Sequence, residues 1–398
     1  MTVELNMETH SELKAELKSE LKSDLKKSAL DLSKADWEAW CQGIGAKPFV
    51  AGQILEWIFA KGILTPDAYS NLSPALRAKL SNAFLWTLPV VDTRLPSSDD
   101  SEKLLWKTRE GFFAESVLMP SKNRVTLCVS SQVGCRMACT FCQTGRMGLT
   151  RDLTRGEILA QLVMANQRLA ELAGDAQLAR KVTNVVFMGM GEPLDNYTEV
   201  VEACRIMIDP RYFGLSKHRV TVSTSGLVPE IERLGQDLPV ALAISLHSAD
   251  DAQRSEMMPV NRRYPLAELK RALLAYPAHP RYGITFEYVM IDGKNDSIAH
   301  AKKLVKFIHG LKAKVNLIPL NAHPGSGMES TDAERMREFQ KYLAERSIPA
   351  PVRYSRGQDV SAACGQLAAK REDELSMAPR LVALARRREY LATKNSQT

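Results

Sequence analysis

Short apolar segments alternate with helix-period segments from about residue 125 to residue 346 of this chain. The helix-period segments repeat apolar residues every three or four positions, and the apolar runs between them have the length of buried strands. Strands are expected at 125–130, 182–189, 218–224, 239–247, 284–291 and 314–320, and helices at 154–172, 196–207, 264–275, 296–311 and 331–346. This rhythm predicts an α/β fold with a parallel sheet, open or curled into a partial barrel, whose ligands bind at the carboxyl ends of the strands.

The first part of the chain has other patterns. Residues 11–27 repeat leucine every four positions between charged residues, which predicts a solvated helix with a narrow apolar stripe. Two amphipathic segments then predict a small helical module, and KLLWKTREGFFAESVLMP predicts a β-hairpin that turns near Arg109-Glu110-Gly111. We therefore expect five regions: a charged extension (1–33), a helical accessory domain (34–95), a β-hairpin linker (96–124), the parallel-sheet domain (125–350) and a C-terminal segment (351–398).

Composition places the chain among ordinary globular proteins, since 45% of its 398 residues are apolar and 25% are charged. No stretch approaches the ~20 apolar residues of a membrane span, and no signal peptide is recognisable. Seven cysteines, an odd number, suit a reducing compartment better than a disulfide scaffold, so we expect a cytoplasmic protein. Cys41 and Cys204 are expected to pack as buried apolar residues. The net charge of +7 permits a nucleic-acid partner without requiring one.

The densest chemical signal is the run Cys135-Arg-Met-Ala-Cys139-Thr-Phe-Cys142, which directly follows the first predicted strand of the sheet. Iron–sulfur clusters usually take four thiolates, so three neighbouring cysteines suggest a cluster with one iron left open to a ligand. A zinc site completed by a distant His or Cys, or a disulfide with one spare thiol, fits the same spacing. The run alone leaves these alternatives open.

Small polar residues follow several of the predicted strands. Gly191 and Glu192 lie in the turn GMGEP, Ser223 in VTVSTSG, Ser245 and His247 in AISLHS, and Asn321 in LIPLN. Because the ends of parallel strands meet at one edge of a sheet, these residues outline a polar cup. Cys128 lies on the first strand, and Cys364 lies in a segment of small and polar residues that would expose a reactive thiol.

The motifs CxxxCxxC, GMGEP, VTVSTSG, SLHS, LIPLN and RGQDVSAACGQL together resemble the RlmN/Cfr family of radical S-adenosylmethionine RNA methyltransferases, over about residues 45–370. The resemblance implies a partial (β/α)6 barrel with a small N-terminal helical domain and a β-hairpin extension. It implies that Cys135, Cys139 and Cys142 hold a [4Fe-4S] cluster whose open iron chelates S-adenosylmethionine. The implied cofactor contacts are Gly191, Glu192, Ser223, Ser245, Leu246, His247 and Asn321.

The resemblance also implies a reaction scheme. Cys364 is the implied methyl carrier, Cys128 its resolving thiol through a transient disulfide, and Glu115 the proton acceptor. One S-adenosylmethionine methylates Cys364, and a second yields the radical that activates the S-methyl group for addition to adenine. The implied substrates are an adenosine of 23S rRNA in the peptidyl transferase centre and the adenosine 3′ of the anticodon in some tRNAs, both methylated at carbon 2. A flavodoxin-like one-electron donor, thiol reagents that reset the disulfide, and a monomeric enzyme without a membrane partner complete the expectation.

Three alternative functions remain open at this point. Methylation of carbon 8 of the same rRNA adenosine uses the same motifs, as in the Cfr branch. An activase of a glycyl-radical enzyme would share only the cysteine triplet, and a zinc-stabilised RNA-binding module would need no cluster. Candidate RNA-contacting residues are Lys122, Arg124, Arg146, Arg151, Arg380, Arg386, Arg387 and Arg388.

Overall fold

The computed structural model describes residues 26–174, 180–281, 283–321 and 327–367. These fall into two compact units, of which the first ends at Leu88 and the second begins at Pro89. The predicted leucine-striped helix lies outside the described residues except for its last two positions, and the C-terminal arginines predicted to bind RNA also lie outside them.

The first unit is helical and closes on an aromatic core. Its helices are α2 (Lys34–Gly43), α3 (Phe49–Leu55) and α4 (Pro74–Ala83), with shorter turns η1 (Ala29–Asp31), η2 (Glu56–Ala60) and η3 (Pro66–Ala68). Ser33 begins α2 with a capping box. Its side chain accepts a hydrogen bond from the Asp36 amide, and the Asp36 side chain accepts one from the Ser33 amide. Trp37 and Tyr69 are fully buried. The helical module predicted from amphipathic segments is therefore present.

Both ends of this unit differ from the predicted domain limits. Ala29, Leu30 and Leu32, which were assigned to the charged extension, are buried in the unit. The Ala29 amide donates to the Leu85 carbonyl at 2.8 Å, which joins the start of the unit to its end. Residues up to 95 were assigned to the helical domain, but Val90–Pro96 form strand β1 of the second unit.

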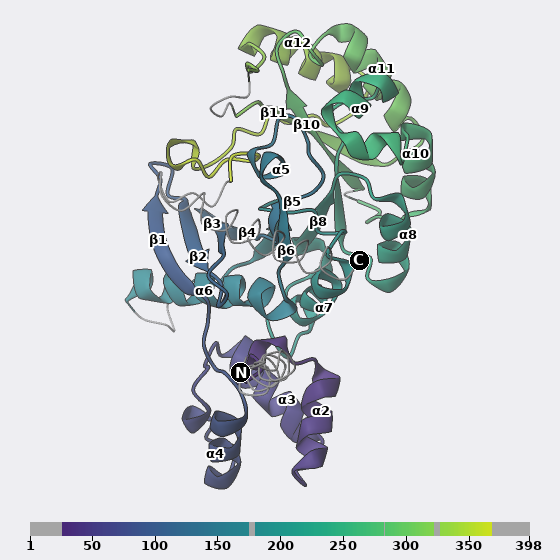
Figure 1. Ribbon diagram of the computed structural model, residues 1–398. Coiled ribbons are helices and arrows are strands. Elements are labelled where there is room, and N and C mark those ends of the chain that lie inside the picture. The colour runs from purple at the N-terminus through teal and green to yellow at the C-terminus, as the bar shows by residue number, and fades with distance from the viewer. Residues whose placement is uncertain (1–25, 175–179, 282, 322–326, 368–398) are drawn as a thin grey trace, which may run out of the picture. The chain divides into compact units, whose positions relative to one another are not determined.

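The second unit is built on a nine-stranded sheet in the order β1-β2-β3-β4-β7-β8-β9-β10-β11 (Figure 1). Its first four strands are antiparallel: β1 (Val90–Pro96), β2 (Glu102–Lys107), β3 (Phe113–Ser121) and β4 (Arg124–Cys128). The other five continue from β4 in parallel: β7 (Asn184–Phe187), β8 (Val220–Thr224), β9 (Ala241–Ser245), β10 (Ile284–Met290) and β11 (Ala313–Pro319). Six parallel strands in chain order confirm the predicted α/β core.

Helices connect the parallel strands, and several follow one another along the outside of the sheet in Figure 1. They are α6 (Arg155–Ala173), α7 (Tyr197–Ile208), α8 (Val228–Asp237), α9 (Asp251–Met257), α10 (Leu266–Ala275), α11 (Ile298–Ile308) and α12 (Ala333–Ala344). The sequence did not predict α8 and α9. Among the described helices, none combines the length and the apolar character that crossing a membrane requires.

The predicted hairpin is β2 and β3, and it turns where the sequence indicated. The Thr108 amide donates to the Phe112 carbonyl at 2.7 Å, and the Gly111 amide donates to the Thr108 carbonyl at 3.0 Å. Strand β1 extends this hairpin on its outer edge. The antiparallel strands thus widen the parallel sheet on the side of β4, the strand that leads into the cysteine run.

Candidate active site

The three cysteines of the CxxxCxxC run line one cavity at the carboxyl ends of the parallel strands, here called the site cavity. The cysteine loop, Cys135–Cys142, joins β5 (Gln132–Cys135) to α5 (Gln143–Met147). Strand β5 pairs antiparallel with β6 (Gly148–Asp152), so a small second sheet supports the loop from both sides. The structure therefore brings the run to the ligand-binding end of the fold, as the sequence predicted.

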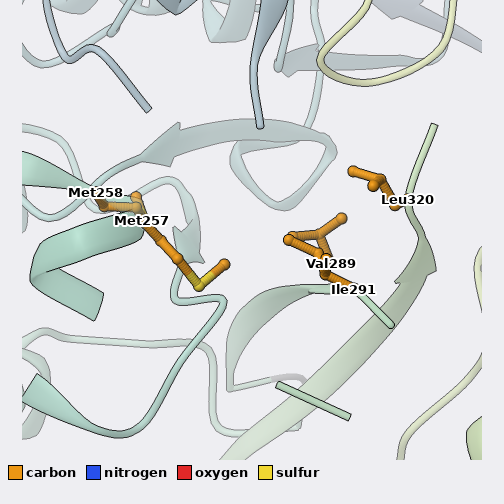
Figure 2. Close-up of a cluster of buried hydrophobic side chains, with 5 residues drawn as sticks. All are labelled: Met257, Met258, Val289, Ile291 and Leu320. Carbon is orange, nitrogen blue, oxygen red and sulfur yellow. The ribbon is translucent and has the colours of Figure 1, made fainter. Parts of the chain in front are cut away.

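A buried apolar cluster lies beneath the cysteine loop. Its members are Met257, Met258, Val289, Ile291 and Leu320, with the two methionines opposite the other three in Figure 2. Cys139 and Phe141 pack against this cluster. The Thr140 amide donates to the Met257 carbonyl at 3.0 Å. Apolar contacts from β10, from the segment after β11 and from the end of α9 thus fix the position of the loop.

The chemistry of these thiols suits a cationic cofactor. Burial raises the pKa of Cys135 to about 12 and also raises the pKa values of Cys139 and Cys142. The charges of Cys142 and Cys135 raise the pKa of Cys139 further, so the three would repel one another as thiolates. Binding of iron offsets both effects, because a coordinated thiol is deprotonated. Within the described ranges, no three His, Cys, Asp or Glu side chains are grouped as ligands of a single metal ion.

The turn after β7 brings backbone close to the cysteine-loop strand. Gly191 has φ +102°, and a Cβ atom there would lie 2.6 Å from Cβ of Gln132, so only glycine fits without strain. Glu192 is buried; its Oε2 accepts from the Ser225 amide at 2.7 Å and its Oε1 accepts from the Leu194 amide at 3.1 Å. Burial raises the pKa of Glu192 despite these bonds. Both residues line the site cavity, where they could receive an amine-bearing ligand.

The other predicted cofactor residues divide into two groups. Ser223, Ser245, His247 and Asn321 all line the site cavity. Leu246 does not line it, and its side chain is fully buried. The backbone of Leu246 is also engaged, since its amide donates to the Glu287 carbonyl at 3.0 Å and its carbonyl accepts from Arg254 Nε at 3.1 Å. The structure therefore brings four of these five strand-end residues to the cavity.

His247 enters the cavity as a neutral ring of defined tautomer. Burial, with the charge of Arg254 as a smaller cause, lowers the pKa of His247 to about 3. The Val289 amide donates to His247 Nδ1 at 3.0 Å, which places the ring proton on Nε2. The residue adopts a left-handed φ of +54°, and its ring meets the Phe141 ring edge-on at 4.7 Å between centroids. His247 can therefore donate one hydrogen bond to a ligand and cannot act as a base at neutral pH.

The segment Ser355–Leu367, here called the Cys364 loop, meets the cysteine loop at the same cavity. The Gln143 amide donates to the Gly365 carbonyl at 2.7 Å, and Thr144 Oγ1 donates to the Leu367 carbonyl at 2.6 Å. Asn321 Nδ2 donates to Ser355 Oγ at 2.8 Å and to the Cys364 carbonyl at 3.2 Å. Asn321, predicted as a cofactor contact, is in this structure also an anchor of the Cys364 loop.

Cys128 and Cys364 line a second cavity inside the curved sheet, here called the barrel cavity. Cys364 also lines the site cavity, so it lies where the two cavities meet. Both thiols are free. Cys128 is buried, whereas Cys364 is an exposed residue, as the small polar segment around it predicted. Protein atoms around its thiol, with the charges of Glu287 and Cys142, nevertheless raise the pKa of Cys364 to about 11; burial and the charge of Cys364 raise that of Cys128. The fold thus gathers two thiols from distant parts of the chain.

Glu115 lies on β3 and is buried away from both cavity linings. Its Oε1 lies 3.2 Å from Nζ of Lys103, and its carbonyl accepts from Ser130 Oγ at 2.5 Å. Lys103 Nζ also donates to the Ser361 carbonyl at 3.3 Å, which links Glu115 to the Cys364 loop. Two residues further along β3, Val117 is the register partner of Cys128. Glu115 is therefore near the thiol pair but already ion-paired.

Sequence reasoning missed two buried charged residues of the site. Arg254 is fully buried and donates to the carbonyls of Leu246, Ser225 and Ser245 at the ends of β8 and β9. Burial lowers its pKa to about 10. Glu287 lies on β10 and lines both cavities. The available signal was a lone carboxylate inside the apolar strand sequence ITFEYVM.

The predicted RNA-contacting residues within the described ranges also differ from one another. Arg151 is committed to ion pairs with Glu157 and Glu110, at 2.6 and 2.8 Å. Lys122, Arg124 and Arg146 are exposed, and Arg124 borders the barrel cavity.

Cys41 and Cys204 are fully buried, as predicted.

Comparisons with known proteins agree with this geometry. Residues 129–305 match the family model of the Radical SAM superfamily, and residues 28–85 match that of the ribosomal RNA large subunit methyltransferase N-terminal domain. A protein of Anaeromyxobacter sp. (strain Fw109-5), named dual-specificity RNA methyltransferase RlmN, is 49% identical over 82% of this chain and 86% of its own length. Its namesake in Anaeromyxobacter dehalogenans (strain 2CP-C) is 46% identical, over 82% and 88%. The crystal structure of a radical SAM methyltransferase from Sphaerobacter thermophilus matches with a TM-score of 0.80 and 43% identity, covering 86% of this chain and all of that one.

Proposed function

Since this chain belongs to the RlmN family of radical S-adenosylmethionine RNA methyltransferases, we propose that it methylates carbon 2 of adenosine in two kinds of RNA. The substrates are an adenosine of 23S rRNA in the peptidyl transferase centre and the adenosine 3′ of the anticodon in some tRNAs. The observation that carries the proposal is the meeting of Cys364 with Cys128 in one cavity and with the three loop cysteines in the other. A carrier thiol needs contact with both a methyl donor and a resolving thiol.

The enzyme carries a [4Fe-4S] cluster and S-adenosylmethionine, as its family does. We assign the cluster to Cys135, Cys139 and Cys142, whose buried thiols fit a cationic group with one iron left for the cofactor. When bound, this pair supplies a methyl group and one-electron chemistry. Glu192 and the neutral ring of His247, from separate strand ends, offer an acceptor and a donor for the cofactor's polar groups.

Cys364 and Cys128 then act in sequence. Cys364 takes a methyl group as a thioether. The methyl group then loses one hydrogen atom to the radical that the bound cofactor would supply, its carbon bonds to the adenine ring, and the adduct gives up the ring proton and one electron. The Cys128 thiolate attacks the Cys364 sulfur: an S–S bond forms, the S–C bond breaks, and the carbon leaves with the electron pair and takes a proton. External thiols reduce the disulfide with two electrons and restore both cysteines. Glu115, two residues along β3 from the partner of Cys128, is the proposed acceptor of the ring proton.

Nucleoside analysis of RNA tests this function. The purified enzyme is given S-adenosylmethionine labelled in the methyl group, a one-electron reductant and RNA from a strain that lacks the activity. We expect labelled 2-methyladenosine in both 23S rRNA and tRNA. Labelled 8-methyladenosine in rRNA alone would assign the enzyme to the Cfr branch and overturn the proposal, and so would cofactor cleavage without any labelled RNA.

A further inference from the structure

One carboxylate stands between the two cavities of the site. Glu287 is a buried residue of β10, and it lines both the site cavity and the barrel cavity. Cys364 is the thiol that lines the same two cavities. The charge of Glu287 opposes ionisation of Cys364, so the two groups interact electrostatically across this boundary.

The neighbours of Glu287 hold its carboxylate in a fixed orientation. Asn316 on β11 donates from Nδ2 to Glu287 Oε1 at 2.8 Å, and Arg353 donates from Nε to Asn316 Oδ1 at 3.4 Å. Within the described residues, Oε2 of Glu287 accepts no hydrogen bond from the protein and remains available to a proton from the cavity. The charged groups that face Glu287 are Lys314 and Arg353, and the titratable one is Cys364.

The protonation equilibrium of Glu287 suits proton exchange near neutral pH. Burial raises the pKa of Glu287 to about 7, against the hydrogen bond from Asn316 and the charges of Lys314 and Arg353. An acid or base is most effective when its pKa lies close to the working pH. Glu287 is therefore ionised in a large share of molecules and can also hold a proton.

We propose that Glu287 is the base that takes the thiol proton of Cys364 when this cysteine is methylated. The inference rests on the carrier role of Cys364 in the proposed function. The S–H bond breaks and the proton passes to Glu287 Oε2, directly or through one water. The sulfur forms a bond to the methyl carbon of S-adenosylmethionine, and the electron pair of the broken S–C bond stays on the cofactor's sulfur, which becomes the neutral thioether of S-adenosylhomocysteine.

This transfer avoids a second anion beside Glu287. Before the step the pair carries one negative charge on Glu287, and during the step that charge passes to the Cys364 sulfur as the proton moves across. The net charge of Glu287 and Cys364 together therefore stays constant until the methyl group, transferred without its bonding electrons, reaches the sulfur. Without such a base, the thiol would have to ionise beside an existing carboxylate, which its raised pKa of about 11 disfavours.

Other groups of the site cavity are less suited to this role. Glu192, the other carboxylate among the described lining residues, accepts backbone hydrogen bonds at both oxygens. His247 accepts a backbone hydrogen bond at Nδ1 and holds its proton on Nε2. Glu115 lies outside the cavity lining and pairs with Lys103. Glu287 thus combines an oxygen that accepts no hydrogen bond from the described residues with a place beside Cys364 in the lining of both cavities.

The rate of Cys364 methylation under single-turnover conditions tests the proposal. Protein with unmodified Cys364 is loaded with cluster anaerobically and mixed with S-adenosylmethionine, and the S-methylated peptide is followed by mass spectrometry. We expect Glu287→Gln to lower this rate about 100-fold at pH 7.5, and Glu287→Asp to retain at least a tenth of it. Glu338→Gln, on the exposed face of α12, is the matched control and should methylate at the wild-type rate.

The pH profile of the methylation rate separates a base from a structural residue. In the wild-type enzyme the methylation rate should rise through pH of about 7, where Glu287 ionises, and then level off. In Glu287→Gln the residual rate should instead keep rising above pH 7 toward the pKa of the Cys364 thiol, which lies below its wild-type value of about 11 once the Glu287 charge is removed. A wild-type rate that rises continuously to pH 10 would overturn the proposal.

Alkylation of Cys364 by iodoacetamide gives a readout without cofactor. The thiolate is the reactive form, so removal of the Glu287 charge should move the midpoint of the alkylation curve to lower pH in Glu287→Gln. An unchanged midpoint together with unchanged methylation would remove Glu287 from the mechanism while leaving the proposed function intact. A wild-type enzyme that methylates RNA without ever forming S-methylated Cys364 would remove the carrier role itself.

Discussion

The cysteine loop (Cys135–Cys142) and the Cys364 loop (Ser355–Leu367) bring thiols to the same cavity but are held there in different ways. Apolar packing and the small β5/β6 sheet support the cysteine loop. The Cys364 loop is held by hydrogen bonds from the β1–β2 turn, from Asn321 and from α5, and by one ion pair between Arg356 and Asp99; several of the contacts with the turn are exposed. Exposed polar contacts stabilise less than buried apolar ones. The proposed cofactor site thus gains rigidity, while the proposed carrier thiol, which would have to meet several partners, keeps more freedom to move.

Loss of one cysteine from each loop gives the largest contrast. We expect Cys142→Ser to lose bound iron and, with it, both cofactor cleavage and RNA methylation, because two thiols cannot hold the cluster. Iron analysis and the release of 5′-deoxyadenosine measure this. Cys204→Ala, a buried cysteine of α7 outside the site, is the matched control and should keep its iron. Retention of full iron in Cys142→Ser would contradict the ligand assignment.

Removal of the carrier thiol should separate the two reactions. We expect Cys364→Ala to lose RNA methylation entirely while it cleaves S-adenosylmethionine within about threefold of the wild-type rate, since the cysteine loop remains intact. Labelled nucleosides and 5′-deoxyadenosine are measured in the same reaction. Loss of both activities would show that the Cys364 loop forms part of the cofactor site rather than a separate carrier.

The position of the cysteine loop could be predicted from the sequence more readily than that of the Cys364 loop, and the reason is physical. The six parallel strands and the CxxxCxxC run are local patterns, so periodicity and spacing locate them. The proposed role of Glu287 depends on strand order and register, which place Asn316 opposite it and the Cys364 loop beside it. Such contacts join segments far apart in sequence. Only the resemblance to a family, and not the local pattern, brought Cys128 and Cys364 together before the structure did.

Helix α8 shows the same limit at the level of secondary structure. Pro229 and Gly235 interrupt its apolar pattern, and both residue types disfavour a continuous helix. Pro229 lies in the first turn, where a missing amide hydrogen costs little. Gly235 packs closely against Pro277 in the segment that follows α10, since a Cβ atom at position 235 would lie 3.0 Å from Pro277 Cδ. The formation of α8 therefore depends on tertiary contacts, which the local sequence does not show.

Truncation of the apolar cluster should weaken the cysteine loop through packing alone. Met258 is fully buried beneath it, so we expect Met258→Ala to lower the free energy of unfolding by about 2 to 5 kcal/mol. Thermal unfolding and iron content after mild heating measure the effect. Leu274→Ala on α10 is the control, because Leu274 is 56% exposed and its loss should change stability little. Equal effects of the two substitutions would contradict the supporting role of the cluster.

A smaller effect is expected where the β1–β2 turn holds the Cys364 loop. Asp99 Oδ2 accepts from the Gly357 amide at 3.0 Å and pairs with Arg356. Burial opposes its ionisation, but hydrogen bonds from Ser101 and Gly357 and the charge of Arg356 hold the pKa of Asp99 below its usual range. We expect Asp99→Asn to speed amide exchange in residues 357–364 about tenfold, by loss of the charged pair. RNA methylation should fall severalfold while cofactor cleavage is unchanged.

The pH dependence of this contact has a defined sign. A carboxylate with a lowered pKa in the folded protein stabilises it above the ordinary pKa of about 4 and loses that contribution as the pH falls. Exchange in 357–364, corrected for its intrinsic pH dependence, should therefore increase below pH of about 4 in the wild type and change less in Asp99→Asn. Strand β8 (Val220–Thr224) is the internal control. If acid loosens both proteins equally, another group holds the Cys364 loop, and the contrast between the two loops would have to rest on packing alone.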